Sequence, residues 1–207
     1  MTRQVIIAMA RWIGAAAIAV ALGFQAWADL TFGTFTWDQL PAYFTPLANL
    51  VGIAALTAAG TFSARGGGEP RWVSLLRVNA TTYLVIVAAV YWSLLAPYAY
   101  VKLPWANAVI HGGAALLLLV DWLLVRPRRQ LPRRSVWTVL SLPLAWLGYL
   151  AARAAFDGWM PYPFLDLSRG ALPVVLTVAA LACAVLGTAA VLHRVSGAGA
   201  FARHTGH

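Results

Sequence analysis

The chain has 207 residues, of which 61% are hydrophobic and only 10% are charged, and its mean hydropathy is +0.74. Soluble globular domains carry about a quarter charged residues, so this composition excludes an ordinary soluble fold and indicates an integral membrane protein. The formal net charge of +9 would suggest a nucleic-acid partner in a soluble chain, but in a membrane protein arginines first report topology, and we expect no nucleic-acid binding.

Six segments are apolar over about 20 residues, the length that crosses roughly 30 Å of hydrocarbon at 1.5 Å per residue. They must be helices, because each backbone polar group in a bilayer has to be satisfied within its own segment. The predicted spans are 5–27, 42–64, 73–96, 105–125, 136–156 and 171–193. We therefore predict an all-α polytopic membrane protein, a six-transmembrane-helix bundle that forms a single domain over residues 1–207.

Arginine placement predicts the orientation of the spans, because Lys and Arg in short loops are retained on the cytoplasmic side. Of the 15 Lys and Arg residues, only Lys102, Arg153 and Arg169 fall at the predicted outer end. Both termini are therefore expected in the cytoplasm, with the protein in the cell membrane. The basic start and the string Ala26-Trp27-Ala28 resemble a cleavable signal peptide, but the apolar run is longer than a typical signal, so we expect the first span to be retained.

The second span carries a candidate nucleophile. Thr45 lies about three residues, or roughly 5 Å, inside the outer boundary, and Asn49 follows one turn later on the same helix face. Thr45 and Asn49 could each have a structural role instead of a catalytic one. Threonine in membrane helices commonly bonds its own backbone, and asparagine commonly bonds a neighbouring helix. A catalytic role for Thr45 therefore depends on a base at the same depth.

The fourth span supplies such a base. His111 lies about six residues, or roughly 9 Å, inside the outer boundary, and an ionisable side chain at membrane depth indicates a functional site. A hydroxyl within reach of an imidazole gives an activated nucleophile and its general base, the groups that acyl transfer requires. Asn107 precedes His111 by one turn, and Asn49 or Asn107 is expected to orient the imidazole, to stabilise an oxyanion or simply to join helices.

Two further ionisable residues in the spans are given structural roles. Asp121 lies about 15 Å deeper than His111 on the same helix, so it cannot orient that ring directly, and we expect Arg77 or Arg126 to neutralise it. His193 stands beside Arg194 at the predicted cytoplasmic end of the sixth span, where a cation favours a helix C-terminus.

No metal site or cofactor is predicted. The single cysteine, Cys183, lies in an apolar run and excludes an intrachain disulfide or a thiolate metal cluster. His204 and His207 are too near the end of the chain to be treated as metal ligands.

The connection between the fifth and sixth spans is rich in proline and aromatic residues, and it runs Asp157-Gly-Trp-Met-Pro-Tyr-Pro-Phe-Leu-Asp-Leu-Ser-Arg169. Proline restricts the backbone and aromatic rings favour the membrane interface, so we predict that this loop packs over the outer mouth of the bundle as a lid. Tyr162 and Phe164 are candidate supporting residues. Asp166 and Arg169 either support the site or pair with each other or with Arg153.

Three of these segments together resemble the androgen-induced-gene and androgen-dependent TFPI-regulating proteins and their bacterial relatives, the Pr-six-Pr membrane proteins. The matching pieces are Tyr43-Phe-Thr-Pro-Leu-Ala-Asn-Leu50, then Asn107 with His111 and Asp121, then Gly158-Trp-Met-Pro-Tyr-Pro-Phe-Leu-Asp166. In order and spacing they cover most of the six-span core, and the Tyr-Pro-Phe-Leu-acid string is the most specific.

The resemblance implies a six-span hydrolase in which an intramembrane threonine and histidine cleave fatty acid esters of hydroxy fatty acids. By position, Thr45 matches the nucleophile and His111 the catalytic histidine. The chain departs from the animal proteins at Pro46, at Ala108, where they have another histidine, and at Asp121 and Asp166, which replace glutamates. These departures leave the pair intact and bear on the identity of the substrate.

The sequence thus predicts a lipid-ester hydrolase with its active site toward the outer face, acting on a membrane lipid ester without a metal or cofactor. The alternative is a non-enzymatic membrane protein for lipid or small-molecule binding, transport or assembly, in which His111 binds or gates.

A rhomboid-like protease is disfavoured because the chain lacks a Gly-x-Ser-Gly string. A haem carrier is disfavoured because His111 and His193 lie toward opposite faces. The oligomeric state is left open.

Overall fold

A computed structural model of the chain describes residues 2–33, 36–66, 68–125, 127 and 130–201, with the side chains of residues 169 and 196–201 outside that description. Within these residues the fold is helical and has no strand, so the predicted all-α class is confirmed. Six helical segments are long and apolar enough to cross a membrane, and they overlap the six predicted spans. Their bounds are Arg3–Thr31, Phe44–Ala64, Arg71–Tyr98, Pro104–Leu124, Arg133–Asp157 and Ala171–Val195.

Two of the six spans contain a π-helical turn. The third span is α3 (Arg71–Val90), then a π turn over Tyr91–Leu95, then a 3-10 turn over Ala96–Tyr98. The fourth span is α4 (Pro104–Ala108), a π turn over Val109–Gly113 and α5 (Ala114–Leu124). These segments are called the Tyr91 π turn and the His111 π turn below.

The other spans are α1 (Arg3–Thr31), α2 (Phe44–Ala64), a 3-10 stretch over Arg133–Leu140 that leads into α6 (Ser141–Asp157), and α7, which runs beyond its apolar window to Phe201. Short 3-10 turns lie outside the spans at Trp37–Ala42, Pro163–Leu165 and Leu167–Arg169. Gly158 ends α6 in the left-handed conformation, with φ of 70°, which glycine adopts without steric cost.

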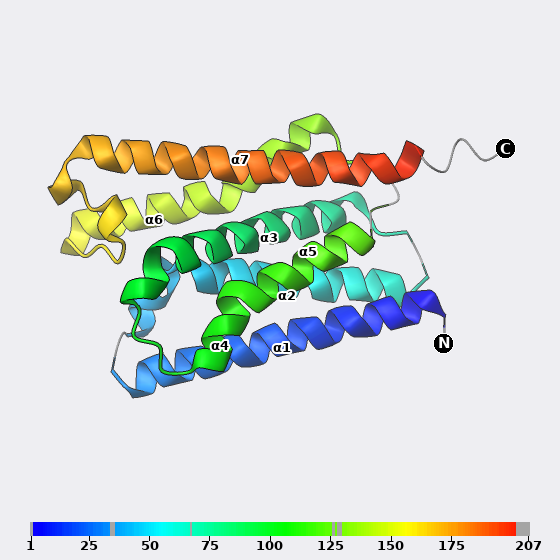
Figure 1. Ribbon diagram of the computed structural model, residues 1–207, viewed down its shortest axis with the longest axis horizontal. Helices are drawn as coiled ribbons and strands as arrows, with labels where there is room; N and C mark the ends of the chain where they lie inside the picture. Colours follow the sequence, from blue (N-terminus) through cyan, green and yellow to red (C-terminus); the bar gives the residue numbers. More distant parts are fainter. Residues whose placement is uncertain (1, 34–35, 67, 126, 128–129, 202–207) are drawn as a thin grey trace.

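The helix α3 lies in the middle of the bundle (Figure 1). It contacts α2 and α5 on one side and α7 on the other, and α1 packs against α2 beyond it. The helix α1 begins and α7 ends at the same end of the bundle (Figure 1). We call this the basic end, because Arg3, Arg65, Arg71 and the 3-10 stretch that begins at Arg133 lie there.

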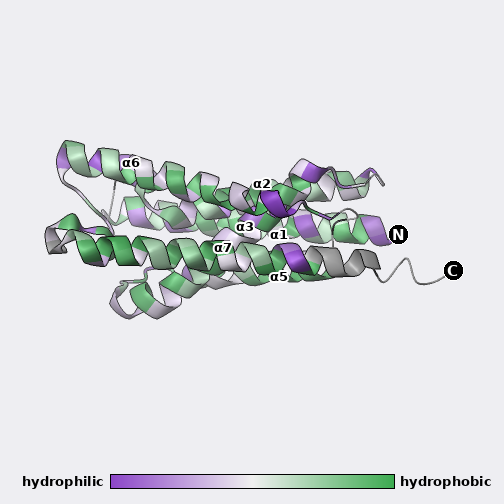
Figure 2. Cartoon of the chain, turned by 90° about the horizontal axis from the view of Figure 1, so that it is seen from above, coloured by the Kyte–Doolittle hydropathy of each residue, from purple (hydrophilic) through white to green (hydrophobic). Residues whose placement is uncertain are grey.

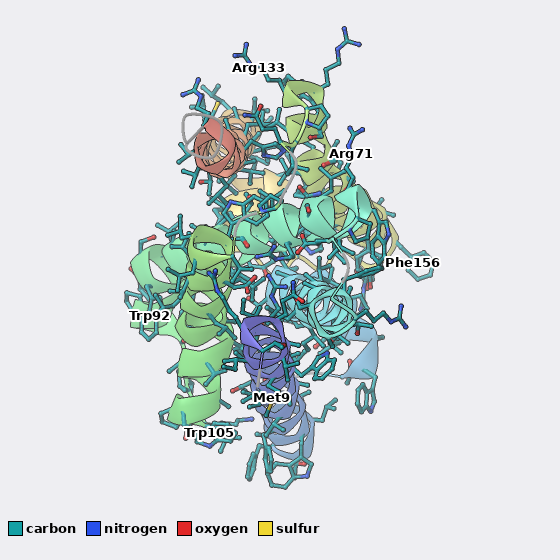
Figure 3. All side chains as sticks on the ribbon, turned by 90° about the vertical axis from the view of Figure 1, so that its right-hand side faces the viewer. Met9, Arg71, Trp92, Trp105, Arg133 and Phe156 are labelled. Carbon is teal, nitrogen blue, oxygen red and sulfur yellow. The ribbon has the colours of Figure 1, made fainter. Side chains whose placement is uncertain are left out.

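Small residues let α1 and α2 approach closely, as is common between membrane helices. A Cβ atom on Gly60 would lie 2.7 Å from the indole nitrogen of Trp12, so no larger residue fits there without displacing the ring. By contrast, α6 and α7 expose many large apolar side chains. Figure 2 shows α7 hydrophobic along most of its length, and Phe156, which is 93% exposed, projects outward from the bundle (Figure 3). Such a surface suits contact with lipid tails.

The basic end contains a buried ion network that joins four helices. Arg77 donates Nε to the Asp121 carboxylate at 2.9 Å and Nη1 to Glu69 at 2.9 and 3.1 Å. Arg11 donates Nε to the other Asp121 oxygen at 2.7 Å and Nη1 to the Ala59 carbonyl at 3.0 Å. The predicted partner Arg77 is therefore confirmed for Asp121, while Arg126 lies outside the described residues. Arg11, which the sequence indicates only as a topology signal, is also neutralised inside the bundle.

Candidate active site

Thr45 lies in the first turn of α2, and this position decides what its hydroxyl can do. Threonines further along a helix, such as Thr61 and Thr82, donate to the carbonyl four residues earlier, at 2.9 and 2.8 Å. No such carbonyl of the same helix precedes Thr45, because α2 begins at Phe44. Its Oγ1 instead lies 3.2 Å from Nε2 of His111, so the structure brings together the two side chains that sequence depth had paired.

The tautomer of His111 follows from its second contact. Its Nδ1 lies 3.1 Å from the main-chain oxygen of Asn107. A carbonyl oxygen can only accept, so Nδ1 must carry the proton, and Nε2 is left with a lone pair that accepts from the Thr45 hydroxyl. The main-chain carbonyl of Asn107 therefore orients the imidazole, whereas the expected role belonged to the asparagine side chain.

The plane of the imidazole is held by the third span. The ring of Tyr91 stacks on His111 with centroids 3.7 Å apart and an interplanar angle of 18°. Its neighbour Trp92 donates Nε1 to the main-chain oxygen of His111 at 3.1 Å. The Tyr91 π turn therefore contacts both the ring and the backbone of the His111 π turn. Such turns are frequent at functional sites, because they re-aim side chains inside a helix.

Tyr91 was missed from sequence, although the same depth argument finds it. It lies about five residues, or roughly 8 Å, from the outer end of the predicted span 73–96, close to the depth of His111. An aromatic residue near the end of a span is usually interpreted as an interface anchor, so the role of Tyr91 in the site was not predicted.

Asn49 links the backbone of Thr45 to the backbone of the His111 π turn. It is fully buried, and its Nδ2 donates to the main-chain oxygens of Thr45 at 2.9 Å and of Ile110 at 3.0 Å. Both amide hydrogens are thus occupied by main-chain carbonyls, which leaves none for an oxyanion and matches the helix-joining alternative. Asn49 fixes α2 against the His111 π turn.

The loop between α6 and α7 packs over the site, as predicted. The hydroxyl of Tyr162 accepts from the backbone N–H of Phe44 at 3.1 Å, and its ring packs edge-on against Trp146 at 5.5 Å and tilted against Phe164 at 5.2 Å. Burial raises the pKa of Tyr162 to about 12, so its hydroxyl keeps its proton. Phe44, the residue before Thr45, supplies a hydrogen to this oxygen, so the O–H of Tyr162 can still donate at the start of α2.

The acidic residue of the loop has a local backbone role. A carboxylate oxygen of Asp166 accepts from the N–H of Ser168 at 2.9 Å, and Asp166 also lines the cavity described below. Arg153, one of the partners considered for Asp166, pairs with Asp38 at 2.7 Å and with Asp157 at 2.6 Å. The side chain of Arg169 lies outside the described residues.

Two cavities meet at Thr45. The outer cavity, of about 840 Å³, is open and is lined by Thr45, His111, Asp166 and Thr177 among others. The inner cavity, of about 150 Å³, lies between α3, α6 and α7 and is almost wholly apolar. Thr45 and His111 therefore both lie at the wall of an open cavity that a ligand can enter.

The remaining sequence candidates lie elsewhere. His193 does not cap a helix end, because α7 continues to Phe201; its Nδ1 lies 2.8 Å from the Ala189 oxygen and its Nε2 3.3 Å from Ser135 Oγ. His204 and His207 lie outside the described residues. Within the described part of the chain, no group of three His, Cys, Asp or Glu side chains is placed to hold a metal ion.

Comparisons with family models, with curated proteins and with solved structures find no match to this chain.

Proposed function

We propose that the chain is an intramembrane lipid-ester hydrolase in which Thr45 is the nucleophile and His111 the general base. The observation that carries the proposal is the 3.2 Å contact between Thr45 Oγ1 and His111 Nε2, with Nδ1 held as a donor by Asn107. His111 takes the hydroxyl proton as Oγ1 attacks the ester carbonyl, and returns it to the departing alkoxide. Water, deprotonated by the same imidazole, then releases the acid.

Two donors are available for the negative charge that develops on the carbonyl oxygen. The N–H of Thr45 lies in the first turn of α2, where helix geometry leaves N–H groups without intrahelical acceptors and the helix dipole favours an anion. The O–H of Tyr162 is held beside it through Phe44. We assign the oxyanion to these two groups.

We also place the basic end in the cytoplasm and the site toward the outer face of the cell membrane. The exposed arginines Arg3, Arg65 and Arg71 at the basic end support this orientation, since Arg11 and Arg77 are neutralised internally. A lipid ester would then enter from the outer leaflet. Fatty acid esters of hydroxy fatty acids are the first substrates to test, on the strength of the resemblance described above.

Labelling with a fluorophosphonate tests the proposal, because such probes trap activated hydroxyl nucleophiles. The purified full-length protein should be labelled at Thr45, and Thr45→Ala and His111→Ala should lower the labelling rate at least about 10³-fold, as loss of a catalytic nucleophile or base does elsewhere. Thr61→Ala is the matched control, since its hydroxyl on the same helix bonds the Thr57 carbonyl. Equal labelling of all four proteins would exclude the hydrolase.

A lipid carrier is the second candidate, and the apolar inner cavity favours it. A carrier would bind a fatty acid or lipid ester without turnover, and Thr45→Ala would leave that binding unchanged. Mass spectrometry of the lipid after incubation distinguishes the two, because only the hydrolase releases an acid and an alcohol.

A further inference from the structure

Thr45 divides two cavities of different chemistry. The cavities share the side chains of Thr45, Tyr91, Leu95, Tyr162 and Phe164, and every other lining residue belongs to one of them alone. A ligand that reacts at Thr45 can therefore extend in two directions from its reacting carbon.

Beyond this shared boundary, the ionisable and hydroxyl-bearing side chains among the described lining residues belong to the outer cavity. His111, Asp166 and Thr177 face the outer cavity. The far part of the inner cavity is lined by aliphatic side chains, among them Ile86, Leu181, Ala182 and Val185. The one indole nitrogen in its wall, that of Trp146, is already donated to the Ala42 carbonyl at 3.0 Å. A carboxylate or hydroxyl would be desolvated without a partner in the inner cavity, whereas a hydrocarbon chain would not.

The position of His111 fixes which half of an ester lies where. When the acyl carbon bonds to Thr45 Oγ1, its bond to the alkoxy oxygen breaks, and that oxygen must receive the proton that His111 took from Thr45. His111 lines the outer cavity and not the inner one, so the alkoxy oxygen has to leave on the outer side. The acyl carbon remains on Thr45 with its chain pointing the other way.

We propose that the inner cavity is an acyl-chain site and the outer cavity an alcohol site, so that the substrates are esters of an unsubstituted fatty acid with a polar or bulky alcohol. This inference rests on the proposed hydrolase function. The helix α7 lines the outer cavity as far as Thr177 and the inner one from Val178 to Val185. Those seven steps span about 10 Å, which suits an acyl chain of about eight carbons.

Matched substitutions on α7 separate the two sites. Ala182→Phe fills the inner cavity, Val174→Phe narrows the outer one, and Ala179→Phe places the same ring at an exposed position that lines neither. Ala182→Phe should lower the rate on p-nitrophenyl octanoate relative to acetate by at least about tenfold, without changing the preference between octanoyl esters of ethanol and of a long-chain hydroxy fatty acid. Val174→Phe should change the preference between the two octanoyl esters and leave the octanoate-to-acetate rate ratio unchanged. The opposite pattern, or unchanged ratios in both variants, would overturn the assignment.

A measurement that needs no turnover separates this inference from the hydrolase itself. Octanoic acid with a diazirine at its terminal carbon should crosslink to residues 181–185 of α7 or 86–90 of α3, and Ala182→Phe should abolish the adduct. Crosslinking there by a protein that hydrolyses no ester would reject the hydrolase and support an acyl-chain site in a carrier. Crosslinking elsewhere, by an active protein, would reject the acyl-chain site alone.

Discussion

Two polar clusters at opposite ends of this bundle differ in how their hydrogen-bonding groups are satisfied. At the basic end, Arg11 and Arg77 are each 2% exposed and are matched by Glu69 and Asp121, with backbone carbonyls taking the spare guanidinium hydrogens. At the opposite end, Thr45 and His111 share one hydrogen bond and face a cavity. The first cluster is internal and its charges are paired, whereas the second leaves a hydroxyl and an imidazole facing an open cavity.

The contrast shows how a structural ionisable group in a membrane helix can be distinguished from a functional one. A buried charge whose donors and acceptors are all used holds helices together, because removing any partner leaves another charge unpaired. A neutral imidazole with one nitrogen fixed by the backbone and the other aimed at a hydroxyl has capacity left for chemistry. Variants at either end can break or sharpen this distinction.

The largest expected effect is on stability, from Asp121→Asn. The substitution keeps the shape of the side chain but leaves two buried guanidinium groups facing one remaining carboxylate, so it should cost about 3–5 kcal/mol of unfolding free energy. Denaturant unfolding in detergent measures this cost. The fraction that remains folded should label at Thr45 at the wild-type rate.

The control for Asp121→Asn is Asp38→Asn, which removes the same charge from an ion pair with Arg153 at the opposite end. Asp38 is 62% exposed, so solvent screens the pair and the change should be small. If both variants lost equal stability, the network at the basic end would have no special structural role.

The sequence carried enough to predict the six spans and the pairing of Thr45 with His111. The spans follow from apolar runs of membrane length, and the pairing follows from counting residues inward from one membrane face, since helical rise converts number into depth. Depth says nothing about rotation around the helix axis. It therefore could not show that the main-chain carbonyl of Asn107 contacts the ring.

The features that were missed depend on contacts between segments far apart in the chain. Arg11 joins Asp121 across 110 residues, and its position near the basic N-terminus made it read as a topology signal. The His111 π turn is accompanied by donors from two other helices, Asn49 to the Ile110 oxygen and Trp92 to the His111 oxygen. No local pattern in the fourth span specifies those donors.

A second expected effect, of intermediate size, tests the oxyanion assignment. Tyr162→Phe removes one hydroxyl and should lower kcat about 10²-fold with little change in KM, because the lost hydrogen bond forms mainly in the transition state. Steady-state hydrolysis of a water-soluble ester measures this. A rise in KM at constant kcat would show that Tyr162 only shapes the binding site.

The raised pKa of Tyr162 also makes the unfolding free energy of wild type depend on pH above about 10, a contribution that Tyr162→Phe lacks. Burial raises that pKa to about 12 from the ordinary 10, so the folded state holds the proton more tightly than the unfolded chain. The contribution of the neutral hydroxyl to stability is therefore complete below about pH 10 and is lost as the pH rises through about 12. Between these values the unfolding free energy of wild type should fall more steeply than that of Tyr162→Phe. Parallel curves would contradict a buried, protonated hydroxyl.

The smallest expected effect concerns the π turns, and it decides whether the reactive cluster is held in place or merely close. Trp92→Phe keeps an aromatic ring but removes the donor to the His111 carbonyl, a hydrogen bond worth about 1 kcal/mol. If that bond positions the imidazole, hydrolysis should slow a few-fold more than stability alone explains. Trp72→Phe removes the same indole nitrogen from an exposed tryptophan near the basic end and should change neither property. A Trp92→Phe protein that is slightly less stable but fully active would mean that the stacked ring of Tyr91 and the Asn107 carbonyl suffice to orient His111.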